Sequence, residues 1–298
     1  MLKKRLITGT ILSLAIIGLF IADNRIEEIS TLQDIMSRIS ESANLAGLLL
    51  ALLAMTIAPF IAIELGAISN GINVRSNVII SWLLIELWIC LFFFLPSSID
   101  ATYLLALFSS VFLVGFLLPI ILSAKHKDLS GSVASASFTV ATSTYVAVGV
   151  GFLLLIRQEH DALWILGIIA IVKMCDIGAF FIGCNFGKHK LIPLVSPKKT
   201  WEGLIGGLLV AMLTAIGLSK LNNIYLIEEP EISLAQASLL GLTLGLLGQL
   251  GDLLISVFKR DSRIKDTAAV LPGMGGVLDV IDSLLIVGPI SYWLLQII

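Results

Sequence analysis

The stretch Gln249–Ser283 reads QLGDLLISVFKRDSRIKDTAAVLPGMGGVLDVIDS and interrupts an otherwise apolar part of the chain. It holds four basic residues and five carboxylates, and apolar runs flank it, one ending at Leu250 and the next beginning at Leu284. Charge held between two membrane segments is costly, and ionisable groups in such places usually have a function. The stretch therefore predicts a membrane protein with a functional charged segment.

A glycine-rich turn lies directly before two of these carboxylates. Gly273, Gly275 and Gly276 precede Asp279 and Asp282, which are three residues apart and so share one face of a helix. A glycine turn that opens a helix presents N–H groups and the positive end of the helix dipole to phosphate. Carboxylates suit Mg²⁺, which usually takes one or two of them together with substrate phosphates. The pattern indicates phosphate and magnesium chemistry, and a merely solvated loop is the alternative interpretation.

The same stretch resembles the signature of the phosphatidate cytidylyltransferase (CDP-diacylglycerol synthase) family. The residues that match it in order are Ser256, Lys259, Arg260, Lys265, Asp266, Pro272, Gly273, Gly275, Gly276, Asp279 and Asp282. Two positions depart from the family's usual residues, since Met274 stands in place of His and Val280 in place of Arg.

A second charged segment follows a span that itself contains Lys173 and Asp176. Ser196–Gly203 reads SPKKTWEG, and its cations Lys198 and Lys199 can meet a polyphosphate or an anionic headgroup. Such a pair alone is more often a membrane-surface anchor. The family commonly carries D-x-G-A near Asp176 and S-P-K-K-T-W-E-G, so the resemblance extends over Asp176–Ser283. A third departure is Cys184, where the family often has Arg.

Composition places the whole chain among polytopic membrane proteins. Of its 298 residues, 57% are hydrophobic and 13% are charged, and the mean hydropathy is +1.02, which excludes an ordinary soluble domain. The three cysteines form neither a metal-binding pair nor a disulfide framework. Partners expected from the sequence are membrane lipids and no nucleic acid, and the Gly- and Ala-rich spans permit a homodimer without requiring one.

Nine apolar runs have about the length needed to cross a membrane. They are Leu6–Ala22, Leu45–Gly66, Val78–Leu95, Tyr103–Leu122, Val133–Ile156, Leu163–Ile182, Leu204–Leu218, Leu234–Leu250 and Leu284–Ile298. In lipid each run must be helical, because its backbone groups need internal partners. The sequence predicts an all-α polytopic membrane bundle with about nine transmembrane helices. It is one domain, 1–298, with N-terminal helices over 1–160 and catalytic helices and loops over 161–298, and the small-residue run Val133–Ile156 is expected inside the bundle.

The basic residues predict an orientation. With a cytoplasmic N-terminus, fourteen Lys and Arg fall in cytoplasmic segments, and Lys173 lies in a span. The external loops then hold Arg25, Arg38, Arg157 and Lys220, along with acidic residues that include Asp23. The apolar spacing from Ile26 to Ile39 suggests either a surface helix or an extension of a neighbouring helix. We expect a bacterial inner-membrane protein with its active-site loops in the cytoplasm.

The resemblance implies a nucleotidyltransferase of phospholipid biosynthesis that joins CTP to phosphatidate, giving CDP-diacylglycerol and pyrophosphate with Mg²⁺. Catalytic roles are expected for Asp252, Asp279, Asp282, Lys259 and Arg260. Those three carboxylates are the expected metal ligands, with Asp176 beside them or on a second cation. The expected substrate-binding residues are Ser196, Lys198, Lys199, Ser256, Lys265, Asp266, Gly273, Gly275 and Gly276.

Other functions remain open at this point. The nearest are a CTP-dependent lipid-alcohol kinase and a cytidylyltransferase for another lipid phosphate, which share a site of lysines, carboxylates and glycines. A transporter with a charged midplane site is a different class. It predicts interrupted helices in corresponding halves of the chain, a pattern that the sequence does not show.

Overall fold

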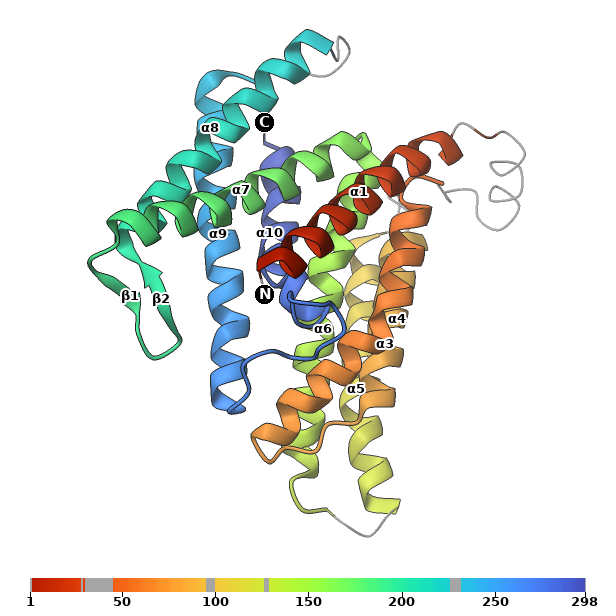
Figure 1. Ribbon diagram of the computed structural model, residues 1–298. Coiled ribbons are helices and arrows are strands. Elements are labelled where there is room, and N and C mark those ends of the chain that lie inside the picture. Colours follow the sequence, from red (N-terminus) through yellow and green to blue (C-terminus); the bar gives the residue numbers. More distant parts are fainter. Residues whose placement is uncertain are drawn as a thin grey trace. The chain divides into compact units, whose positions relative to one another are not determined.

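The computed structural model describes residues 2–27, 29, 45–94, 100–125, 129–225 and 232–297, and most of these residues are helical (Figure 1). The helices are α1 (Leu2–Glu27), α3 (Leu48–Gly71), α4 (Val78–Phe94), α5 (Ala101–Lys125), α6 (Ser132–Glu159), α7 (Ala162–Phe186), α8 (Trp201–Tyr225), α9 (Leu234–Asp261) and α10 (Leu278–Leu295). One antiparallel pair of strands, β1 (Lys190–Ile192) and β2 (Ser196–Thr200), lies between α7 and α8.

Eight helices in the described part of the chain are long and apolar enough to cross a membrane, and α4 is a shorter apolar helix. Each of the nine predicted runs falls largely within one helix, so the predicted all-α polytopic membrane bundle is confirmed. Several helices extend past the apolar runs, as α9 does to Asp261. The helices are longer than the apolar runs because backbone hydrogen bonding continues into segments whose side chains are polar. The surface helix or helix extension predicted from the apolar spacing between Ile26 and Ile39 lies mostly outside the described residues.

The chain separates into two compact units. The first contains Met1–Ala162 and Phe258–Val280, and the second contains Leu163–Val257 and Ile281–Ile298. The first unit therefore combines the N-terminal helices with most of the signature segment.

In the first unit, α6 is the central helix. It packs against α4 and α5, while α3 packs against α4 and α1. The small residues of α6 allow close contact, because Gly151 lies against the ring of Phe92, where a Cβ atom has no room. Val146 and Ala147 are completely buried. The predicted interior position of this run is confirmed.

In the second unit, small residues bring helices close together. A Cβ atom at Gly207 of α8 would lie 2.7 Å from the carbonyl oxygen of Cys175 in α7, so no larger side chain fits there. The strand pair that precedes α8 aligns Lys190 with Thr200. The hydroxyl of Thr200 accepts a hydrogen bond from the N–H of Gly203 at 3.1 Å, which satisfies one free donor at the start of α8.

A buried ion pair joins α1 to α6 in the first unit. The Nε atom of Arg157 donates to the carboxylate of Asp23 at 2.7 Å, and the exposed fractions of the two residues are 2% and 0%. That carboxylate also accepts from the N–H groups of Gly47 and Leu49 at 2.9 Å each. The prediction that Asp23 and Arg157 belong to external loops was wrong, because both lie inside helices and pair with each other.

We expect Arg157→Ala to lower the free energy of unfolding by about 3–5 kcal/mol, because it leaves the Asp23 carboxylate buried without its cation. The matched control is Glu86→Gln on α4, whose carboxylate accepts a hydrogen bond from Trp82 on the same helix. That change should cost about 1 kcal/mol. Unfolding of the detergent-solubilised protein measures both, and equal effects of the two changes would contradict the assigned role of the ion pair.

Candidate functional site

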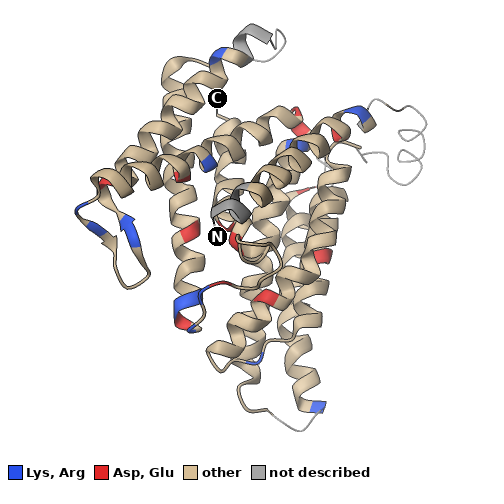
Figure 2. Cartoon of the chain, viewed as in Figure 1, with Lys and Arg blue, Asp and Glu red and all other residues tan. Residues whose placement is uncertain are grey.

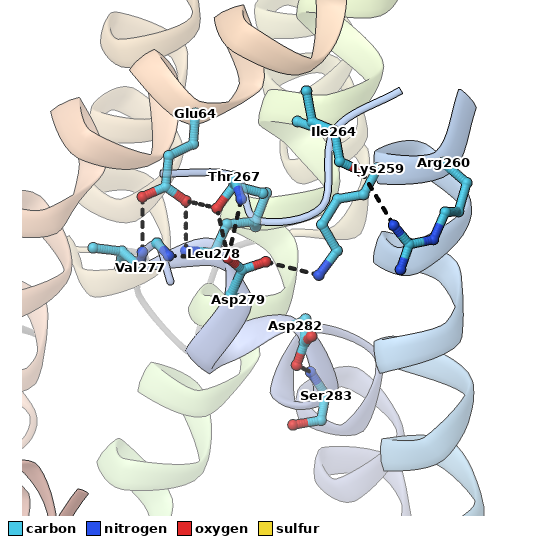
Figure 3. A network of polar contacts seen from close by, with 11 residues as sticks. Glu64, Lys259, Arg260, Ile264, Thr267, Val277, Leu278, Asp279, Asp282 and Ser283 are labelled. Carbon is cyan, nitrogen blue, oxygen red and sulfur yellow. Dashed lines mark hydrogen bonds and ion pairs between the residues drawn. The ribbon is translucent and has the colours of Figure 1, made fainter. Parts of the chain in front are cut away.

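A turn-and-helix cluster in the first unit holds one of the predicted carboxylates. We define the turn cluster as Glu64 of α3, Lys259 of α9, Thr267 and Asp279, which Figure 3 labels, together with Gly276. Its segments are far apart in the sequence, and its polar side chains are mostly shielded from solvent, with Glu64 and Thr267 buried.

Asp279, in the first turn of α10, is the most connected member of the turn cluster. Its Oδ1 atom accepts from the Nζ atom of Lys259 at 2.8 Å. Its Oδ2 atom accepts from the N–H of Gly276 at 2.9 Å and from the N–H of Thr267 at 3.1 Å, and the hydroxyl oxygen of Thr267 also lies 3.1 Å away. A carboxylate in the first turn of a helix also interacts favourably with the helix dipole. Asp279 is thereby fixed in orientation next to one cation.

The glycine turn has a closed backbone structure. Leu271 and Gly275 exchange two hydrogen bonds, from the N–H of Leu271 at 2.9 Å and from that of Gly275 at 3.1 Å. Gly273 and Gly275 have φ angles of 84° and 100°, which favour glycine. The N–H of Gly276 already donates to Asp279. The predicted phosphate binding by these glycines stays a prediction.

A second group of polar residues lies in the second unit. We define the helix cluster as Lys173 and Asp176 of α7, Lys199 of β2, and Gln249 and Asp252 of α9. The cluster contains two lysines, two aspartates and one glutamine, whereas most of each helix carries no Lys, Arg, Asp or Glu (Figure 2).

Direct contacts connect the helix cluster. The Nζ atom of Lys199 lies 2.7 Å from the Asp252 carboxylate, and the Nε2 atom of Gln249 donates to Asp176 at 2.7 Å. Lys173 lies 3.7 Å from the Asp176 carboxylate and donates to the hydroxyl of Ser283 in α10 at 3.0 Å. Lys199, from the S-P-K-K motif, and Asp252, from just before the signature, therefore meet as an ion pair.

The remaining predicted residues occupy varied positions. Asp282 is buried on α10, where its carboxylate accepts from the N–H of Ser283 at 2.6 Å. Arg260 donates to the carbonyl oxygen of Ile264 at 3.3 Å. Lys265, Asp266 and Lys198 are exposed, and Ser196 and Ser256 are half-buried. The roles predicted for these residues stay predictions.

Sequence reasoning missed several residues of both clusters. Glu64, Thr267 and Gln249 were not among the expected site residues, and Lys173 was noted only as an intramembrane charge. Glu64 could have been found, because it is a single carboxylate inside the apolar run Leu45–Gly66 and such charges are usually functional. Thr267 and Gln249 are neutral and carried no comparable signal.

The donor atoms suit magnesium in their chemistry. Among the described residues, no group of three or more His, Cys, Asp or Glu lies close enough to hold a metal ion. Mg²⁺ usually binds one or two carboxylates and takes its other ligands from water and substrate phosphates. The carboxylates of the two clusters fit this chemistry, and no metal geometry follows from them.

Fold and site together define a polytopic helical membrane protein in which one lysine–carboxylate pair, Lys199 with Asp252, joins two separate sequence motifs. The chain matches the cytidylyltransferase family over residues 35–298, and it belongs to that family. The family resemblance predicted from the signature is confirmed.

Curated relatives agree with this family. The chain is 39% identical over 162 residues to a phosphatidate cytidylyltransferase of Staphylococcus aureus strain COL. It is 36% identical over 160 residues to that of Staphylococcus saprophyticus and 37% identical over 160 residues to that of Staphylococcus haemolyticus. Each alignment covers 53% of this chain and 58% of the relative, so the chain spans somewhat more than half the length of the curated relatives it matches.

Proposed function

We propose that this protein is a CTP:phosphatidate cytidylyltransferase that makes CDP-diacylglycerol and pyrophosphate. The observation that carries the proposal is the ion pair of Lys199 with Asp252 at 2.7 Å. It joins two motifs that the sequence places about fifty residues apart. A merely solvated loop or a surface anchor gives no reason for these two motif residues to meet.

The reaction needs little proton transfer. The second pKa of a phosphomonoester is about 6, so phosphatidate is largely a dianion at neutral pH. One of its phosphate oxygens forms a bond to the α-phosphorus of CTP, and the bond from that phosphorus to the bridging oxygen of the β-phosphate breaks. Pyrophosphate leaves with the electron pair of that bond. Such phosphoryl chemistry depends mainly on positioning and on neutralising charge.

The lysines of the two clusters supply the positive charge. Lys199 and Lys259 are each held by a carboxylate, which keeps the side chain ordered before the substrate binds. We propose that each exchanges its carboxylate for a phosphate oxygen when the triphosphate is present. Lys198, Arg260 and Lys265 are proposed as further phosphate contacts, and Ser256 and Asp266 as residues that orient them.

Carboxylates are the proposed metal ligands. Asp252, Asp279 and Asp282 are proposed to supply hard oxygen atoms, with Asp176 as a further ligand or on a second cation. Magnesium, when bound, neutralises charge on the triphosphate and polarises its α-phosphate. Before binding, these carboxylates are held by Lys199, Gln249, Lys259 and backbone N–H groups.

The apolar helices suit a lipid substrate that enters from the membrane. We propose that the protein resides in a bacterial inner membrane with its N-terminus and charged segments in the cytoplasm, where CTP is available. The excess of basic residues on that side supports this orientation. The homodimer stays a prediction.

The proposed reaction has a defined product pair. Purified protein given CTP, phosphatidate and Mg²⁺ is expected to release pyrophosphate and to form CDP-diacylglycerol in equal amounts. Omitting phosphatidate is the control and should abolish both products. Release of CDP with a lipid alcohol as acceptor would instead identify the kinase alternative, and a lack of any CTP turnover would contradict both enzymes.

A further inference from the structure

Glu64 is a buried carboxylate that the proposed reaction does not use. It lies on α3, with an exposed fraction of 1%. Its Oε1 atom accepts from the N–H of Val277 at 2.7 Å, and its Oε2 atom accepts from the N–H of Leu278 at 2.9 Å and from the hydroxyl of Thr267 at 2.6 Å (Figure 3). All three donors belong to the signature segment, more than 200 positions later in the chain.

We propose that Glu64 is a positioning residue for the signature segment, and that residue 276 is glycine in order to admit the Glu64 carboxylate. In this role Glu64 fixes the first turn of α10 and orients Asp279 through Thr267. The predicted effect of Glu64 on turnover rests on the proposed function. Its predicted effect on the backbone at the start of α10 does not.

The first turn of α10 needs an external acceptor. The first N–H groups of a helix have no partner within the helix, and a carboxylate placed there also interacts favourably with the helix dipole. A residue just before the helix usually supplies that acceptor. Here Glu64 of α3 accepts from Val277 and Leu278, so the start of α10 depends on a side chain from another helix.

Thr267 connects Glu64 to the predicted metal ligand Asp279. Its hydroxyl lies 2.6 Å from Glu64 and 3.1 Å from Asp279, and its N–H also donates to Asp279 at 3.1 Å. A hydroxyl carries only one proton to donate. The shorter contact indicates that Glu64 takes this proton, which fixes the rotamer of Thr267 beside Asp279.

The lack of room for a Cβ atom explains why residue 276 is glycine. In the glycine turn, Gly273 and Gly275 have positive φ angles, whereas Gly276 is not among the residues with this conformation. The backbone therefore permits alanine at position 276. A Cβ atom there would collide with the Oε2 atom of Glu64 and the hydroxyl of Thr267. The competing explanation is that the missing side chain leaves room for a substrate phosphate.

A double-mutant cycle separates these two explanations. We expect Glu64→Ala to lower kcat by about tenfold to hundredfold with KM for CTP changed by less than about threefold, because misplacing a reacting group mainly affects turnover. Gly276→Ala should have a similar effect, since its Cβ atom displaces the same carboxylate. The Glu64→Ala/Gly276→Ala double variant should be no slower than the slower single variant.

Two outcomes would overturn the proposal. If the two effects on kcat multiply, Gly276 serves the substrate directly. If Glu64→Ala keeps wild-type kcat, Glu64 does not position the site. Glu64→Gln is a second variant in case Glu64→Ala does not fold, because glutamine keeps the size of the side chain. Its amide N–H would face one of the three donors, so this variant should also lower kcat. The matched control is Glu86→Gln on α4, which should leave kcat unchanged.

Hydrogen exchange tests the same contact without any catalytic assay. We expect the amides of Val277 and Leu278 to exchange at least about tenfold faster in Glu64→Ala than in wild type, while amides within α4 keep their rates. Unchanged rates would contradict the contact itself. Faster exchange together with an inactive wild-type enzyme would keep the positioning role and reject the proposed function, so the two failures are distinguishable.

Discussion

Replacing Asp279 by asparagine is expected to lower kcat by about 10³-fold, a loss comparable to removal of a key electrostatic group from an active site. The substitution keeps the shape of the side chain but removes its charge. The new side chain could still accept from Gly276 and Thr267 through its carbonyl oxygen, so the turn should keep its structure. Its amide would face Lys259, and the site would lose both the ion pair and the proposed metal ligand.

The measurement is pyrophosphate release at saturating CTP, together with the thermal unfolding midpoint. Asp261→Asn is the matched control, because Asp261 is an exposed carboxylate at the end of α9. It should keep turnover within about twofold, as expected for a surface change that touches no special feature. An Asp279→Asn protein with near-normal turnover at low Mg²⁺ would show that Asp279 is not a ligand.

The second large effect concerns the ion pair of Lys199 with Asp252. We expect Lys199→Met and Asp252→Asn each to lower kcat/KM by about 10²- to 10³-fold, because each removes a charge that we propose contacts the triphosphate or its metal. Each single variant also breaks the partly buried ion pair. The unfolding midpoint of each should therefore fall slightly.

The double variant Lys199→Met/Asp252→Asn distinguishes a catalytic pair from a structural pair. Its unfolding midpoint should return toward the wild-type value, since no unpaired charge is left. Its activity should stay as low as that of the slower single variant. Recovery of activity in the double variant would show that the pair is only structural. Lys188→Met, which changes an exposed lysine just after α7, is the control and should keep activity.

The membrane helices were predictable because apolar runs and helices coincide closely in lipid. Every backbone group there needs an internal partner, so the length and composition of a run nearly determine the structure. The predicted boundaries were less accurate at helix ends. The charges of Asp23 and Arg157 predicted that both lie in loops, yet they pair inside α1 and α6, where mutual neutralisation permits burial.

The candidate site was only partly predictable. Lys259, Asp279, Lys199 and Asp252 are charged residues in recognisable motifs, and the structure joins them in two pairs. Glu64 comes from the N-terminal part of the chain, outside the two charged motifs from which the site was predicted. Its partners are two backbone N–H groups and one hydroxyl, which leave no mark in the sequence, so only the three-dimensional structure could reveal the contact.

Two departures from the usual signature, Met274 and Val280, lie beside the turn cluster in the sequence. Met274 contributes its backbone N–H, which donates to Leu271 at 3.0 Å and helps to close the glycine turn. Val280 is the neighbour of Asp279 on α10, so its side chain points in a different direction from that carboxylate. A cation lost at position 280 would weaken nucleotide binding by about tenfold to hundredfold and leave the chemistry intact.

The most direct test of the proposed function follows the phosphates of CTP separately. Purified protein is given phosphatidate, Mg²⁺ and CTP labelled at either the α- or the γ-phosphate, and the lipids are separated by thin-layer chromatography. Cytidylyl transfer predicts that the α-label enters the lipid and that the γ-label leaves as pyrophosphate. A γ-label in the lipid, with the α-label left on free CDP, would contradict the proposal.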